Sequence, residues 1–218
     1  MCRLFSIGLV GAVVVGLASC AGEESTSTAS ESWTCDVVSE SCDDVPTGQT
    51  CPSQCEQADW ILGECTQGTG DRQELLGRMH IALPDEIEYT TNPPATGDHR
   101  PMWACWGEYS FLPATRWLHN LEHGGIAFLY NPCAPESIID ELRDAARRFP
   151  GDETGPFRWV MTPYANLPSA VAVVAWEWVY QANCVQPDEI SEFVRQHYRQ
   201  APEDIAVPGT FSEGYLGN

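Results

Sequence analysis

The cysteines constrain the fold of this chain more than any other feature of its sequence. The 218 residues include ten cysteines, which is too many for a compartment that keeps thiols reduced. Cys2 and Cys20 lie in an N-terminal segment considered below, and the other eight allow 105 disulfide connectivities. These eight are Cys35, Cys42, Cys51, Cys55, Cys65, Cys105, Cys133 and Cys184. The sequence therefore predicts a disulfide-stapled protein that folds outside the cytoplasm.

The N-terminal segment has the pattern of a bacterial lipoprotein signal. One positive charge precedes an almost wholly apolar run over residues 4–18, which closes with Leu17-Ala18-Ser19-Cys20. These four residues resemble the lipobox of bacterial lipoproteins. In such proteins the chain is cleaved before the cysteine, and the cysteine carries the lipid. The run is too short to span a membrane, so we interpret residues 1–19 as a signal peptide and Cys20 as the lipidation site. We expect a lipid-anchored protein of the cell envelope, on the outer membrane and facing the periplasm or the surface.

Two further segments precede the globular part. Residues 20–32 hold the lipidated cysteine and a polar run without aromatic residues, which predicts a disordered tether. Residues 33–69 hold five of the eight cysteines and many turn residues, which predicts a small disulfide-rich appendage. We expect a Cys133–Cys184 disulfide, because each cysteine follows a core strand and parallel strands would bring them together. A remaining appendage cysteine would then pair with Cys105.

The globular domain is predicted to cover residues 70–218. Apolar periodicity and turn residues indicate helices over 113–123, 135–149 and 187–199, a buried strand over 126–130, and paired strands over 157–161 and 170–180. A short strand over 87–90 would extend the sheet. This order, strand-helix-strand-strand-helix, predicts an α+β fold of ferredoxin-like type, with an antiparallel sheet and helices packed on one face.

The charge of the chain excludes one class of partner. It has 11 basic and 31 acidic residues and a formal net charge of −20. Such a field repels nucleic acid and anionic membrane surfaces. We therefore expect no nucleic-acid partner, and the sequence does not specify a protein or glycan partner.

Four of the five histidines lie between His80 and His123. Residues four apart share one helix face, so His119 and His123 should point the same way, as a metal-chelating pair does. Glu122 between them completes an H-x-x-E-H pattern, in which a carboxylate activates metal-bound water. His99 follows a tight loop containing two prolines and a glycine, a rigid platform for a ligand. The candidate metal ligands are His80, His99, His119 and His123, and zinc or copper is the expected ion.

Three interpretations of these residues remain open. The first is a metal-binding domain, in which the nearby Met102 or a free Cys105 would favour copper(I). The second is a zinc hydrolase with Glu122 as catalytic base, which requires an open coordination position. The third is a non-catalytic binding module with structural histidines and a tryptophan-rich surface.

Two motifs resemble a family of exported bacterial proteins known only as a domain of unknown function. The family motifs N-P-P-x-[ST]-G-x-H and H-N-L-E-H-G correspond here to residues 92–99 and 119–124, and the likeness extends over residues 79–203. The resemblance implies a shared site formed by His80, His99, His119, Glu122 and His123. It implies no activity. The cysteine-rich appendage, Cys105, Cys133 and Cys184 depart from the family pattern.

Overall fold

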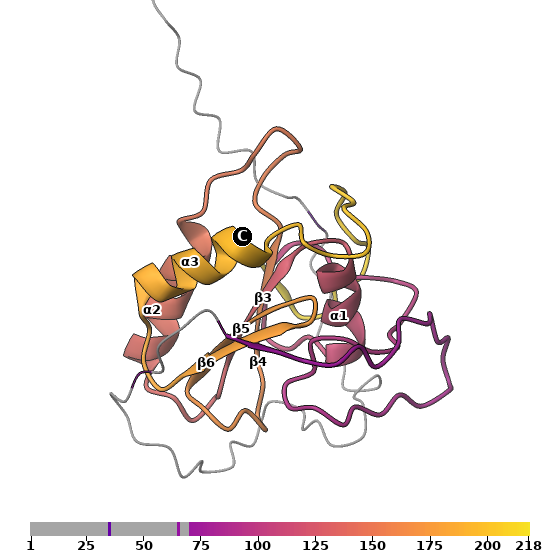
Figure 1. Ribbon diagram of the computed structural model, residues 1–218, viewed down its shortest axis with the longest axis horizontal. Coiled ribbons are helices and arrows are strands. Elements are labelled where there is room, and N and C mark those ends of the chain that lie inside the picture. The colour runs from indigo at the N-terminus through magenta and orange to yellow at the C-terminus, as the bar shows by residue number, and fades with distance from the viewer. Residues whose placement is uncertain (1–34, 36–64, 66–69) are drawn as a thin grey trace, which may run out of the picture.

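The computed structural model describes residues 35, 65 and 70–218 (Figure 1). The predicted signal peptide, Cys20, the tether and most of the appendage lie outside the described residues. Within the described part, no helix is both long enough and apolar enough to cross a membrane.

A seven-stranded mixed sheet forms the centre of the domain, with the strand order β1-β6-β5-β3-β4-β2-β7. The strands are β1 (Asp71–Arg72), β2 (Gly107–Tyr109), β3 (Ile126–Tyr130), β4 (Trp159–Pro163), β5 (Val171–Ala175), β6 (Trp178–Ala182) and β7 (Tyr215–Gly217). The α+β class is confirmed, but the ferredoxin-like antiparallel order is not, because β4 runs parallel to both β3 and β2. The predicted strand over 87–90 is not among these seven.

The parallel pairing follows from the connection between β3 and β4. Helix α2 (Glu136–Arg147) links the two strands, and a helical crossover returns the chain to the end of the sheet from which it started. The strand after α2 therefore adds parallel to β3 on one side. The next strand, β5, adds antiparallel on the other side of β3, so the expected pairing of the strands over 157–161 and 170–180 is wrong.

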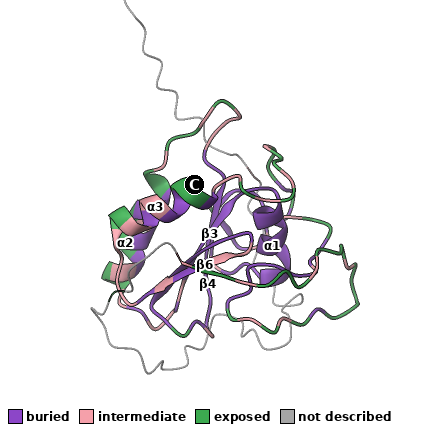
Figure 2. Cartoon of the chain, viewed as in Figure 1, coloured by how far each residue is buried: buried purple, intermediate pink, exposed green. Residues whose placement is uncertain are grey.

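The three predicted helices are present, but they cover both faces of the sheet (Figure 2). Helix α1 (Ala114–Glu122) packs on the face that carries Ala127 and Leu129. Helices α2 and α3 (Pro187–His197) pack on the face that carries Ile126 and Phe128. The prediction of helices on one face is wrong because β3 alternates between two apolar faces, and a continuous apolar strand is typical of a sheet covered on both sides.

The segment predicted as one strand over 170–180 is two strands joined by a tight turn. Trp176 and Glu177 separate β5 from β6, and Glu177 has φ +68°. A positive φ at the second central residue is the pattern of a type II turn, in which glycine or asparagine usually occupies that position. Contacts with distant residues hold Glu177 in this conformation: its N–H donates to the carbonyl of Ala95, and its carboxylate pairs with Arg72. Trp176 and Trp178 therefore belong to opposite faces of the sheet.

The disulfides connect the appendage to the globular domain. Cys35 pairs with Cys105, as predicted for one appendage cysteine, and Cys65 pairs with Cys184. The predicted Cys133–Cys184 disulfide is therefore wrong, although Cys133 is itself disulfide-bonded. Strands β3 and β6 do run in the same direction, but β5 lies between them. Their ends are thus about 9.5 Å apart, or two strand spacings, which is too far for a disulfide.

Proteolysis of the oxidised protein should release the disulfide-linked peptides Cys35–Cys105 and Cys65–Cys184, because the Cα atoms of these pairs lie 6.2 and 5.5 Å apart. Mass spectrometry before and after reduction checks both bonds. A peptide joining Cys133 to Cys184 would contradict this connectivity.

Candidate metal centre

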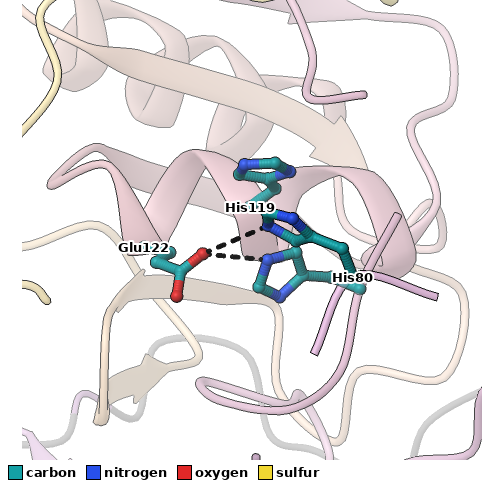
Figure 3. A group of neighbouring side chains, drawn as sticks. His80, His119 and Glu122 are labelled. Atoms are coloured by element: carbon teal, nitrogen blue, oxygen red, sulfur yellow. Dashed lines mark hydrogen bonds and ion pairs between the residues drawn. The ribbon is translucent and has the colours of Figure 1, made fainter. Parts of the chain in front are cut away.

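Three histidines and one glutamate come together beside α1. One ligand atom from each of His80, His99, His119 and Glu122 lies within 4.8 Å of every other. Figure 3 shows His119 and Glu122 on the same helix, with the His80 ring beside them. The ring centroids of the three histidines are 4.5–5.0 Å apart. These four side chains could hold a metal ion.

Backbone pairing places the first two histidines. His80 and His99 form a parallel bridge, in which the N–H of His99 donates to Met79 and the N–H of Ile81 donates to the carbonyl of His99. The Asp98 carboxylate accepts the N–H of Met79 at 2.8 Å. The exposed segment that carries His80 is therefore fixed to the rigid proline-containing loop that carries His99.

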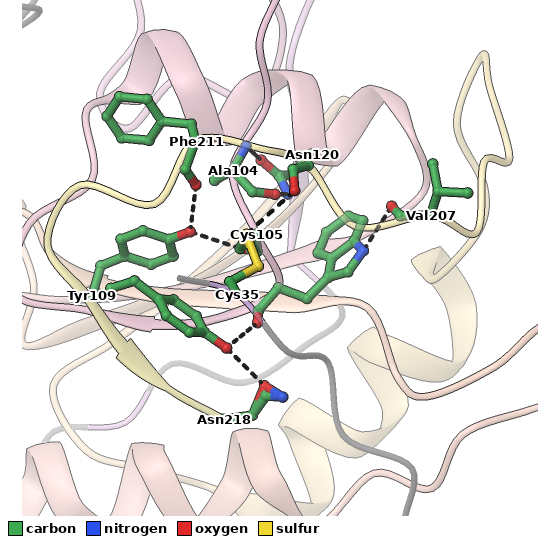
Figure 4. The surroundings of a disulfide bond; sticks show 11 residues. Cys35, Ala104, Cys105, Tyr109, Asn120, Val207, Phe211 and Asn218 are labelled. Carbon is green, nitrogen blue, oxygen red and sulfur yellow. Dashed lines mark hydrogen bonds between the residues drawn. A yellow bond between two sulfur atoms is a disulfide. The ribbon is translucent and has the colours of Figure 1, made fainter. Parts of the chain in front are cut away.

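Helix spacing and one buried asparagine place the other two ligands. His119 and Glu122 are three residues apart, so they share a helix face. Between them, the Asn120 amide accepts the N–H of Ala104 at 2.9 Å and donates to the carbonyl of Ala104 at 2.8 Å. Figure 4 shows this pair next to the Cys35–Cys105 disulfide. Asn120 thus ties the ligand helix to a disulfide-bonded loop.

Two carbonyl groups orient the buried histidine rings. Nδ1 of His99 lies 2.9 Å from the carbonyl oxygen of Gly97, and Nδ1 of His119 lies 2.7 Å from that of Arg100. A carbonyl can only accept, so each Nδ1 carries the proton. In the neutral ring this leaves the lone pair on Nε2, which is the usual arrangement of a metal-ligating histidine.

His99 makes a second contact that one neutral imidazole cannot satisfy. Its Nε2 lies 3.0 Å from the Glu122 carboxylate, while Nδ1 already donates to Gly97. A neutral imidazole has one N–H. The Nε2 contact therefore requires a further proton, on the ring or on the Glu122 carboxyl, or a cation shared by nitrogen and oxygen. The side chain of His99 is fully buried, and such a site suits a metal ion.

The electrostatics of the cluster favour a bound cation. Burial raises the pKa of Glu122, but the hydrogen bond with His99 is the largest opposing cause, and the pKa lies below its usual value. Burial is the main cause that lowers the pKa of His119 to about 3, against the opposing effect of its bond to Arg100. At neutral pH the cluster therefore presents a carboxylate and an uncharged His119 imidazole.

A comparison with protein families identifies the domain. Residues 80–209 match the family described as protein of unknown function (DUF3105). The chain belongs to this family. No curated protein and no solved structure matches the chain. The DUF3105 match begins at His80 and contains all four residues of the cluster.

His123 is the predicted ligand that lies outside this group. Its ring is 4.6 Å from that of His119, so the two share a helix face as predicted. However, Nε2 of His123 lies 3.2 Å from the Glu203 carboxylate, and burial is the main cause that lowers its pKa. Glu203 was not predicted as a partner; the only signal was its place at the end of residues 79–203, over which the sequence resembles the family.

The other donors considered in the sequence serve different purposes. Cys105 is disulfide-bonded, and the exposed Met102 uses its carbonyl to accept a bond from Arg116. His197 is buried far along the chain, where it stacks on Trp178. The cluster of His80, His99, His119 and Glu122 therefore offers nitrogen and oxygen donors and no sulfur donor.

Replacement of Asn120 should destabilise the domain markedly. Asn120→Ala leaves the buried N–H and carbonyl of Ala104 without their partners, at a cost of about 2–4 kcal/mol. Urea denaturation measures the loss. The exposed Gln196→Ala on α3 is the control and should change stability by less than about 0.5 kcal/mol. A loss below about 1 kcal/mol for Asn120→Ala would show that the helix does not depend on this anchor.

Proposed function

We propose that this protein is an exported, lipid-anchored member of the family whose domain binds one transition-metal ion, zinc or copper. The ligands are His80, His99, His119 and Glu122. The observation that carries the proposal is the orientation of the rings. Two carbonyl groups hold the Nδ1 protons of buried histidines, so that the free lone pair of each neutral ring lies on Nε2, and Nε2 of His99 lies 3.0 Å from the Glu122 carboxylate.

The distances within the cluster support a tetrahedral ion. Nε2 of His99 and Nε2 of His80 lie 3.0 and 3.7 Å from the same Glu122 oxygen. Donors around a tetrahedral zinc ion are separated by roughly 3.3 Å, as bonds of about 2.0 Å require. Three imidazoles and a carboxylate suit zinc or copper(II), whereas copper(I) prefers sulfur ligands.

The two other interpretations gain less support. As a catalytic base, Glu122 would have to face a metal-bound water, but its carboxylate lies among the ligand atoms and contacts His99. As a binding module, the domain would need tryptophans on its surface, and none of the tryptophans in the described part is exposed. Glu122 is therefore assigned as a ligand, and the tryptophans belong to the core and its edges.

Replacement of one histidine on α1 should abolish metal binding while replacement of the next leaves it intact. His119→Ala removes a ligand, and His123→Ala removes a ring that is paired with Glu203. Both residues are 2% exposed, so the two variants are matched for burial. Elemental analysis of the purified oxidised proteins should give about one equivalent of metal for the unmodified protein and His123→Ala, and none for His119→Ala.

Circular dichroism spectra of both variants control for folding. Equal metal content in the two variants, or an unmodified protein that is folded and holds no metal, would contradict the proposed site. Separate loading of the unmodified protein with zinc and with copper(II) identifies the preferred ion.

The anchor proposal rests on the lipobox-like sequence at Cys20 and on the disulfides, which require an oxidising compartment. Cys20→Ser should move the protein from the membrane fraction to the soluble fraction of a bacterial host, because the lipid supplies the membrane affinity. Immunoblotting of the fractions and the mass of the N-terminal peptide test this. An N-terminal peptide of the membrane-bound unmodified protein that carries no lipid at Cys20 would contradict lipidation at this residue.

A further inference from the structure

We infer that His80 is an exchangeable ligand, and that a small molecule from solvent with a nitrogen or oxygen lone pair takes its place on the metal. The inference rests on the proposed metal site and deepens it. A tetrahedral site with four protein ligands is closed. Exchange of His80 would open one coordination position to an external ligand.

The exposure of the ligands differs sharply. The side chain of His80 is 47% exposed, whereas those of His99 and Glu122 are 0% and 3% exposed. His119 is buried as well. Among the four candidate ligands, His80 is therefore the one that solvent reaches, so an incoming molecule would approach the ion from its side. Removing any of the other three ligands would instead open a hole in the packed interior.

The rings also differ in how they are held. Carbonyl groups fix Nδ1 of His99 and His119, and in the described part no hydrogen bond fixes either ring nitrogen of His80. Its ring contacts are the ion-pair approach to Glu122 at 3.7 Å, a stacked contact with His119 and an edge contact with His99. The outer-shell bonds that hold a metal-ligating ring in place are thus present for two histidines and missing for the third.

The backbone around His80 allows its ring to leave without unfolding. The hydrogen bonds of Met79 and Ile81 with the backbone of His99 hold the chain on both sides of His80. Rotation about the side-chain bonds of His80 alone would turn the exposed ring into solvent, and such rotations are fast for exposed residues. Departure breaks one nitrogen–metal bond, and the incoming lone pair forms the new one.

The charge of the site defines the class of ligand. A divalent ion carries two positive charges, and Glu122 supplies one negative charge. The remaining positive charge favours a neutral or anionic donor over a cationic one. Imidazole is a suitable probe because it has the same donor atom as the residue that it replaces.

Two variants and one probe test the inference. His80→Ala should still bind Zn²⁺, with an affinity reduced by about 10- to 100-fold, comparable to the loss of an outer-shell partner. His99→Ala should lose measurable binding. Added imidazole should restore the affinity of His80→Ala, because the vacated position is open to solvent, and should not rescue His99→Ala. Competition with a chromophoric chelator measures the dissociation constants.

A second measurement uses the unmodified protein, so the result does not depend on the folding of a variant. Loaded with Co²⁺, it should change its visible absorption when imidazole is added. If imidazole changes neither this spectrum nor the affinity of His80→Ala, or if His80→Ala loses Zn²⁺ as completely as His99→Ala, the inference is wrong while the metal site stands. An unmodified protein that binds no metal would overturn both.

Discussion

The buried imidazole of His99 must find an acceptor or a cation at each of its two nitrogens, because a polar group without a partner is costly in the interior. Gly97 provides the first contact within its own loop, and Glu122 provides the second from α1. This requirement fixes the loop against the helix. Once both are in place, His80 follows through its bridge with His99, and His119 follows because it lies three residues before Glu122 on the helix. The cluster is thus a consequence of one buried ring.

The end of α1 must also be held, since the last carbonyl groups of a helix have no partner within it. Distant parts of the chain supply the donors. The N–H of Glu203 donates to the carbonyl of Glu122, and the buried guanidinium of Arg158 donates to the carbonyl of His123. The N–H of Arg199 donates to the carbonyl of Gly124. Asp204 in turn pairs with both arginines. These distant contacts therefore complete the helix that carries two residues of the candidate cluster, which is consistent with a family match that extends well beyond the histidine motifs.

Local patterns in the sequence predicted the local structure of the site, and long-range contacts decided the rest. Helical spacing was enough to place His119 beside His123. However, His123 lies outside the candidate metal group and pairs with Glu203, 80 residues further along the chain, which helical spacing does not reveal. The same limit applies to the fold. The apolar run of β3 indicated burial without revealing that its two faces meet different helices. The turn at Glu177 lacks the usual glycine or asparagine, because a carbonyl of the proline loop and Arg72 stabilise it instead.

The disulfides use cysteine side chains, whereas the candidate metal cluster uses histidine and glutamate side chains. In an oxidising compartment, thiols are consumed by disulfide formation or lost to further oxidation, so a site built on free cysteines would not persist there. Imidazole and carboxylate ligands do not undergo these reactions. Cys105 illustrates the division: it lies next to Ala104, which Asn120 anchors, yet it is bonded to Cys35 and contributes no ligand. The cysteine therefore supports the loop beneath α1, and oxidation stabilises the framework of the site without removing any of its donors.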